Sequence, residues 1–213
     1  MAFNNRYRPK TVSDIVFPAG TTRDDVYLQV NREIPAPTLI YGPFGSGKSA
    51  GAAAIARTLM VDNYEFNVMQ RAGARITTVA QLSNITQFLE HVPVMANYKI
   101  VVIDELDSMP QPVQTALRDV MDTTSRHGVV LATANNLARI DGGLQDRFTK
   151  IYWGEPVPKL WLPRARQILA SEGVAVADDI LLTVLTNAGV SVREIMRALE
   201  DLADIARAEA AKR

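Results

Sequence analysis

The sequence predicts an α/β fold: a parallel sheet flanked by helices, followed by a small all-helical domain. Short runs rich in apolar and β-branched residues recur with helical segments between them, which is typical of parallel strands joined by crossover helices. In two runs, "KIVVI" at 99–103 and "VVLA" within 128–134, the apolar residues are continuous and do not alternate with polar ones, as expected for strands covered on both faces. After Trp153 the prolines of "GEPVPKLWLP" interrupt the pattern, and no further strand is indicated.

Taken in order, the elements divide the chain into two parts. The strands are expected at 38–41, 64–69, 99–103, 128–134 and 150–153. Helices are predicted over the alanine-rich run 49–60, over the apolar positions spaced from Ile76 to Leu89, and from about Gln111. Two more helices should follow the proline-rich connector, the last with Ser191 as N-cap and Glu194 completing a capping box. We therefore expect a sheet-containing core at 1–155 and a helical domain at 156–213.

The composition excludes several classes of protein. The chain has 23 basic and 23 acidic residues, so any contact with nucleic acid must be local. It has no cysteine, which excludes disulfides and thiolate metal ligands. The N-terminus lacks an apolar signal region, and no apolar run approaches the roughly 18 residues of a membrane span. We expect a cytoplasmic protein without membrane association.

The stretch "GPFGSGKS" has the spacing of a phosphate-binding P-loop, and it lies directly between a predicted strand and a predicted helix. Its glycines let backbone N–H groups point inward at an anion, a lysine adds a positive charge, and a serine hydroxyl can ligate Mg²⁺. The alternative is a glycine-rich turn with an incidental lysine, which the flanking strand and helix disfavour. The predicted nucleotide-binding residues are Gly42, Pro43, Phe44, Gly45, Ser46, Gly47, Lys48, Ser49 and Ala50.

A second motif, "KIVVIDELDSM", places two carboxylates directly after a buried strand. Asp104 is expected to hold Mg²⁺ together with Ser49, and Glu105 to accept a proton from an attacking water. The pair predicts hydrolysis of ATP. The alternative is a solvated acidic cap on the helix that begins near Gln111.

With these motifs the chain resembles AAA+ ATPases, and more narrowly the ATPase subunits of replication sliding-clamp loaders, both of T-even bacteriophages and of the replication factor C small-subunit type. The resemblance spans Asn4 to Leu202 and is carried by "NNRYRPKTVSDIVFPA", "GPFGSGKS", "VVIDELDSMPQPVQTALRDVMD", "LATANN", "LQDRF" and "GVSVREIMRAL". It implies a P-loop AAA+ core with a helical lid. It also implies ATP and Mg²⁺ as cofactors, a homo- or hetero-oligomer of AAA+ subunits, and a sliding clamp and primer-template DNA as partners. If the chain is phage-encoded, its location would be the host cytoplasm.

Carried over residue by residue, the resemblance assigns roles to further side chains. Asn135 would be the first sensor, Arg193 the second sensor, and Arg147 an arginine finger acting in trans on a neighbouring subunit's γ-phosphate. The structural alternatives are a turn-forming Asn-Asn pair, an exposed helix arginine, and an ion pair of Arg147 with Asp146 or Asp141. The adenine side would be lined by Tyr7, Arg8, Pro9, Ile15 and Val16, of which the first and third can equally form a strap over the core.

DNA contacts are a weaker implication of the same resemblance, because arginines in surface loops are often only solvated charges. The candidate residues are Arg71, Arg75, Thr77, Gln111 and Gln114. Trp153 and Trp161 are expected to pack where core and lid join.

The chain departs from the clamp-loader pattern in three places. It has Asp146, Arg147 and Phe148 where the family has Ser-Arg-Cys, and "NVMQ" where the family has Asn-x-Ser-Asp. The sequence also stops after the expected lid, where loader subunits continue into a collar, so either the chain is truncated or it assembles by its ATPase faces alone. Two alternatives therefore stay open beside the clamp loader. One is a collarless AAA+ remodeller or helicase loader acting on protein or DNA. The other is a nucleotide-binding subunit that does not hydrolyse ATP.

Overall fold

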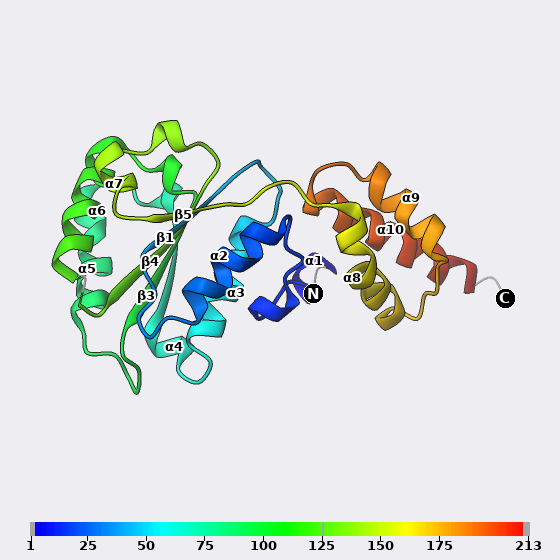
Figure 1. Ribbon diagram of the computed structural model, residues 1–213, viewed down its shortest axis with the longest axis horizontal. Coiled ribbons are helices and arrows are strands. Elements are labelled where there is room, and N and C mark those ends of the chain that lie inside the picture. The colour runs from blue at the N-terminus through cyan, green and yellow to red at the C-terminus, as the bar shows by residue number, and fades with distance from the viewer. Residues whose placement is uncertain (1–2, 125, 211–213) are drawn as a thin grey trace.

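A single five-stranded sheet organises the first part of the chain (Figure 1). The computed structural model describes residues 3–124 and 126–210. Its strand order is β2-β3-β4-β1-β5, and all four pairings are parallel. The predicted α/β fold class is confirmed. The strands are β1 (Thr38–Tyr41), β2 (Val68–Ala72), β3 (Lys99–Asp104), β4 (Gly128–Ala134) and β5 (Thr149–Tyr152).

Helices cover both faces of the sheet. On one face α5 (Ser83–Glu90) and α6 (Gln111–Thr124) supply buried residues such as Leu89 and Leu117. On the other face α2 (Gly20–Val30) and α3 (Lys48–Leu59) do the same (Figure 1). Strands β3 and β4 lie between these layers, which explains the continuous apolar runs at 100–103 and 129–132.

The predicted strand at 64–69 is wrong in its first part. Residues Tyr64–Asn67 form a helical turn, α4, and strand β2 begins only at Val68. The fully buried Asn67 ends this turn, because its side chain donates to the Val94 carbonyl at 2.8 Å and accepts from the Val94 N–H at 2.9 Å. Strand β2 is an edge strand whose residues are mostly exposed, so it carries little of the apolar signal that marks the central strands.

The segment from Ile76 to Leu89 is less helical than its apolar spacing predicts. It contains a short 3-10 turn, η3 (Val79–Leu82), before α5 begins at Ser83. Another 3-10 turn, η2 (Gly73–Arg75), precedes it. Leu82, Ile85 and Leu89 are nevertheless buried in the core, as the spacing predicted.

The part after the connector contains three helices in the described residues, one more than predicted: α8 (Pro158–Ser171), α9 (Asp178–Asn187) and α10 (Val192–Ala210). The prolines misled the prediction. Pro158 occupies the first turn of α8, where its missing N–H costs nothing, and Pro163 lies within the helix. The Arg193 N–H donates to Ser191 Oγ at 3.2 Å, as expected of an N-cap, while Glu194 pairs with Arg197.

The N-terminal helix α1 (Phe3–Arg6) packs on the helical domain rather than on the sheet. Phe3 is buried among residues of α8, α9 and α10, and Glu172 at the end of α8 pairs with Arg6 and accepts a hydrogen bond from Tyr7. The beginning of the chain therefore straps the helical domain. None of the described helices is both long and apolar enough to cross a membrane.

Candidate nucleotide-binding and catalytic site

The loop at 42–47 leaves the end of β1 and leads directly into α3, as the P-loop spacing predicts. Gly45 (φ +74°) and Gly47 (φ +98°) adopt left-handed conformations that side-chain-bearing residues rarely take, so glycine is required at both turns. A Cβ on Gly45 would lie 2.4 Å from Ser191 Oγ, and the Val192 N–H donates to the Gly45 carbonyl at 2.9 Å. The loop is therefore in direct contact with the start of α10 in the lid.

Lys48 lies almost out of solvent, with 6% of its surface exposed. Its Nζ donates to the carbonyl oxygens of Gly42 at 3.0 Å and Pro43 at 2.7 Å. Burial lowers the pKa of Lys48, and the carboxylates of Asp107, Asp104 and Glu105 oppose that shift. A buried ammonium that is held mainly by neutral carbonyls is suited to pair with an anionic phosphate.

Asp104 at the end of β3 lies against the P-loop helix. The hydroxyls of Ser49 and Thr133 donate to Asp104 Oδ1 at 2.6 Å and 2.5 Å. A serine hydroxyl and a carboxylate side by side are ligands that Mg²⁺ accepts, so the residues present fit this cation. Thr133 was missed by sequence reasoning, although a polar residue inside the buried strand "VVLATA" was a usable signal.

Glu105 has an unusual backbone conformation for a residue with a side chain, with φ 56° and ψ 56°. Its N–H donates to Thr133 Oγ1 at 3.0 Å, and the chain then turns into a 3-10 segment, η4 (Leu106–Ser108). This left-handed turn stores strain of the kind that gathers at functional sites, and Glu105 lines the pocket above the P-loop. Gly73 of η2 packs directly against this turn, since a Cβ there would lie 2.4 Å from the Glu105 carbonyl oxygen.

The two asparagines after β4, Asn135 and Asn136, have different surroundings. Asn136 accepts the Ala138 N–H at 2.9 Å and so forms the turn of the structural alternative. Asn135 instead lines the pocket. The backbone N–H groups of Asn135 and Asn136 both donate to Asp107 Oδ2, at 3.2 Å and 3.0 Å. Asp107, a buried carboxylate that sequence reasoning missed, therefore anchors the end of β4 to the acidic motif.

A cavity of about 320 Å³, within the range of small-molecule sites, is lined by Lys48, Ser49, Glu105, Thr133 and Asn135. Arg193 reaches it from the first turn of α10 and Trp161 from α8, so the lid forms one wall. Trp161 was expected only to pack between the domains. A larger groove of about 840 Å³ lies between α2 and α8, but its lining contains none of the P-loop or acidic-motif residues.

The predicted adenine side is divided between this cavity and a smaller one beside it. Tyr7, Arg8 and Pro9 line the main cavity, and the Arg8 guanidinium donates to the Ser49 carbonyl at 3.3 Å. Ile15 and Val16 line the adjoining space of about 50 Å³, which also borders Tyr7 and Trp161. An apolar and aromatic wall next to the phosphate loop is suited to a purine base.

Arg147 lies outside this cavity, after the short helix α7 (Gly142–Gln145). Its Nε and Nη2 donate to Oδ1 and Oδ2 of Asp122 on α6, at 2.8 Å and 2.6 Å, and its Nη1 donates to the Gly143 carbonyl at 2.8 Å. The alternative pairing with Asp146 or Asp141 is wrong, because Asp122 is the partner. The hydrogen bond from Arg147 lowers the pKa of Asp122.

The candidate DNA contacts fall into two groups. The exposed ones are on β2, on η2, just after η2 and at the start of α6: Arg71, Arg75, Thr77 and Gln111. Gln114 is wrong as a DNA contact, because it is completely buried. Its amide donates to the carbonyls of Met109 and Arg139 and accepts the Asp141 N–H, so its hydrogen bonds are used inside the fold.

Comparison with known proteins places this site in a family. The model of the ATPase family associated with various cellular activities (AAA) matches residues 38–155, which is more than half of the chain. The chain belongs to this AAA family. The matched region contains the P-loop, the acidic motif and Asn135, and it ends just before α8.

Curated relatives of this AAA chain confirm the resemblance to clamp-loader subunits. Replication factor C subunit 5 of Mus musculus is 26% identical over 205 residues, covering 92% of the chain and 58% of that protein. The replication factor C small subunit of Archaeoglobus fulgidus is 29% identical over 207 residues, covering 94% of the chain and 63% of that protein. The chain thus spans about three fifths of the length of these relatives.

Solved structures agree on the fold. The RuvB Holliday junction branch migration motor of Thermotoga maritima superposes with a TM-score of 0.80 at 16% identity, covering 97% of this chain and 68% of that one. Domain III of the Thermotoga maritima replication initiation protein DnaA gives 0.70 at 18% identity, covering 94% and 90%. At these identities the likeness concerns the fold alone.

Proposed function

We propose that this AAA chain hydrolyses ATP as a subunit of a sliding-clamp loader, at nucleotide sites shared between neighbouring subunits. One observation carries the proposal. Lys48, Ser49, Glu105 and Asn135 converge on one cavity with the lid's Arg193, and Asp104 lies behind Ser49 and accepts a hydrogen bond from its hydroxyl. The arginine that the family pattern assigns to the γ-phosphate, Arg147, is instead bound on another surface. A cavity equipped in this way is completed by an arginine from outside the chain.

Each residue then has a chemical task. Lys48 and the P-loop N–H groups bind the phosphates, and Ser49 and Asp104 hold Mg²⁺, which when bound neutralises phosphate charge. Glu105 accepts a proton from the attacking water, and the Asn135 amide orients that water. The strained turn of Glu105 fixes its carboxylate over the cavity before nucleotide arrives.

Contacts between loop and lid connect nucleotide binding to the shape of the subunit. The Gly45 carbonyl accepts from the Val192 N–H, and Arg193 follows directly in the sequence. Phosphates bound on the loop therefore act on the first turn of α10 through this contact, and a change in the number of phosphates changes the lid's position. Such a coupling turns the ATP cycle into motion between subunits.

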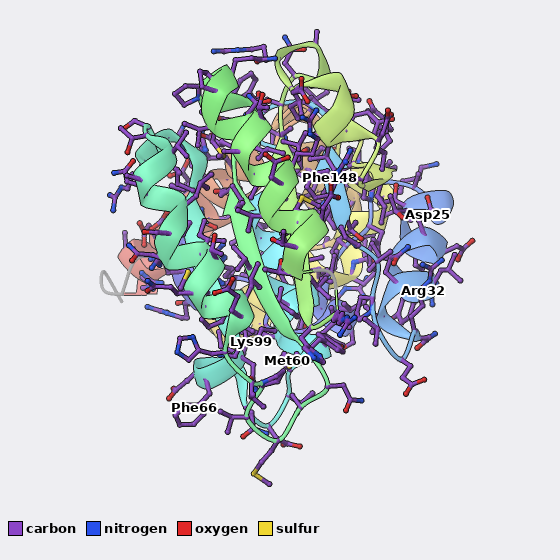
Figure 2. All side chains as sticks on the ribbon, turned by 90° about the vertical axis from the view of Figure 1, so that its left-hand side faces the viewer. Asp25, Arg32, Met60, Phe66, Lys99 and Phe148 are labelled. Atoms are coloured by element: carbon purple, nitrogen blue, oxygen red, sulfur yellow. The ribbon has the colours of Figure 1, made fainter. Side chains whose placement is uncertain are left out.

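An exposed apolar surface supports the proposal that the chain binds a protein partner. Five large side chains from the segment around α4 and from the loop that enters β3 form what we define as the loop patch: Val61, Phe66, Val92, Val94 and Met95. Met95 is 89% exposed, and the two hydrogen bonds between Asn67 and Val94 tie the segments together. In Figure 2, Phe66 lies at the lower end of the molecule, below Lys99 at the start of β3.

The position of the loop patch suits a sliding clamp. It lies at the amino ends of β2 and β3, whereas the nucleotide cavity lies at the carboxyl ends of β1, β3 and β4. A partner on the loop patch would leave the cavity open. Exposed apolar groups of this kind are typical of protein contacts.

Mixing two inactive variants tests the shared site. Glu105→Gln retains Arg147 but loses the base, and Arg147→Ala retains the base but loses the finger. Each variant alone should hydrolyse ATP at least about 100-fold more slowly than the wild type, while a mixture should recover activity because one subunit completes the site of the other. Wild-type activity per subunit should rise with protein concentration.

Two results would contradict the proposal: an Arg147→Ala protein with wild-type activity, or a mixture that assembles and binds ATP but stays inactive. Stimulation by primer-template DNA together with a sliding clamp distinguishes a clamp loader from a remodeller or helicase loader, which should be indifferent to the clamp. A wild-type protein that binds ATP but never hydrolyses it in any assembly would be a nucleotide-binding subunit instead.

A further inference from the structure

We propose that Asp122 is a positioning residue that orients the Arg147 guanidinium for the nucleotide site of the adjoining subunit. This inference rests on the trans role of Arg147 proposed above. It adds a second residue, from a different helix, to the surface that a subunit would offer to its neighbour.

The geometry of the pair is side-on. Both oxygens of Asp122 accept from Arg147, one from Nε at 2.8 Å and the other from Nη2 at 2.6 Å. The Gly143 carbonyl accepts from Nη1 at 2.8 Å. Three contacts from α6 and α7 thus fix the plane of the guanidinium, so the side chain is held without any neighbouring subunit.

The held guanidinium keeps donors for a ligand. A guanidinium has five N–H groups, and the three contacts use three of them. Two N–H groups remain, one on Nη1 and one on Nη2. Arginine N–H groups are donors that a phosphate accepts, and the Arg147 side chain keeps 34% of its surface exposed.

Orientation matters more than strength at this position. Exposed ion pairs contribute little to stability, and the Asp122 side chain is 51% exposed. An arginine without support must be ordered when the subunits meet, whereas a guanidinium already held by Asp122 has lost that freedom beforehand. The alternative is a latch, in which Asp122 withholds Arg147 from the neighbour. The two roles predict opposite effects on the rate.

Asp122→Ala, Asp122→Asn and a matched control measure the effect. The described residues contain a second side-on pair, on the surface of the lid and far from the candidate finger. Arg166 donates through Nε to Asp178 at 3.2 Å and through Nη2 to the same carboxylate. Asp178→Ala therefore removes a carboxylate from an equivalent pair. Each variant is assayed for kcat, KM and ATP affinity in the assembled protein, with its Tm.

We expect Asp122→Ala to lower kcat by roughly 10-fold to 100-fold with unchanged ATP affinity and Tm. In Asp122→Asn, which keeps one acceptor oxygen, kcat should fall less. In Asp178→Ala, kcat should stay at the wild-type value. Placed on Arg147→Ala, the Asp122→Ala change should have no further effect, since Asp122 acts through Arg147.

The outcomes separate the two proposals. A higher kcat in Asp122→Ala identifies a latch and overturns the inference, and so does an equal loss in the Arg147→Ala background, which indicates a merely structural role. If Arg147→Ala is impaired while Asp122→Ala is not, the positioning role falls and the trans finger stands. If Arg147→Ala is fully active, the trans finger falls and the inference with it.

Discussion

Replacing Gly73 with alanine tests whether the turn at Glu105 controls catalysis. A Cβ at this position would lie 2.4 Å from the Glu105 carbonyl oxygen, 3.0 Å from its carbonyl carbon and 3.1 Å from the Asp104 carbonyl oxygen. Ordinary contact begins at 3.4 Å, so η2 and the catalytic turn must separate by about 1 Å. All three contacts are with backbone, and no side chain can move aside to absorb the change.

The expected result is a slow enzyme that still binds ATP. A displacement of about 1 Å at a catalytic group costs on the order of 100-fold in rate, and overpacking costs about 1–3 kcal/mol of stability. The P-loop does not touch Gly73, so ATP affinity should stay within about 2-fold of the wild type. ATP turnover in the assembled protein and ATP binding by the separate subunit measure the two quantities.

Gly20→Ala is the control, because a Cβ there meets nothing within 4 Å. It should leave both turnover and ATP affinity unchanged. If Gly73→Ala turns over ATP at the wild-type rate, the strained turn does not set the position of the base, and the role of Glu105 is refuted. If it loses ATP affinity to the same extent as turnover, the damage has spread to the P-loop and the reasoning fails as well.

Three further predictions concern the lysine, the strap and the loop patch. Because burial lowers the pKa of Lys48, the unfolded chain holds this proton more tightly than the folded chain does. The wild-type Tm should therefore gain a contribution as pH rises from the lowered pKa towards the ordinary 10.5. Lys48→Met should lack that gain, and its Tm should not increase with ATP. Glu172 has a pKa below its ordinary 4.5, first because Tyr7 donates a hydrogen bond to it, so its stabilising effect is present above the ordinary value and is lost as pH falls through the lowered one. Glu172→Gln should therefore lower Tm at pH 7, and the difference from the wild type should vanish in acid. Met95→Glu should abolish binding to a sliding clamp while ATP affinity is retained. The control Ile180→Glu, at a 55% exposed position of the lid, should leave both clamp binding and ATP affinity unchanged. Clamp binding that survives Met95→Glu would exclude the loop patch as the docking surface.

The P-loop and the acidic motif were predictable because their chemistry is local. The left-handed glycines, Lys48 and Ser49 are consecutive or nearly so, and backbone geometry within a few residues decides where their donors point. The central strands were predictable for a related reason. Two-sided burial leaves an unbroken apolar run, which survives any rearrangement of the surroundings.

Other features depended on residues that are distant in the chain. Gln114 has the same polar character as Gln111, yet packing buries it and turns its amide to backbone around Met109 and Asp141. The start of the edge strand β2 could not be predicted accurately, because none of its residues is fully buried. Only the fold brings Thr133 to Asp104 and the Asn135 N–H to Asp107, and no spacing rule links residues on neighbouring strands.

The sequence by itself determined which residues are available to bind a phosphate, to ligate a divalent cation and to act as a general base, because these groups are specified by residue type and short spacing. The tertiary structure decided what supports them and what they face. It placed Trp161 and Arg193 of the lid on the same cavity and set Arg147 against Asp122, 25 residues away. Such pairings arise from the packing of helices, whose relative positions are fixed by the whole core and not by any one segment.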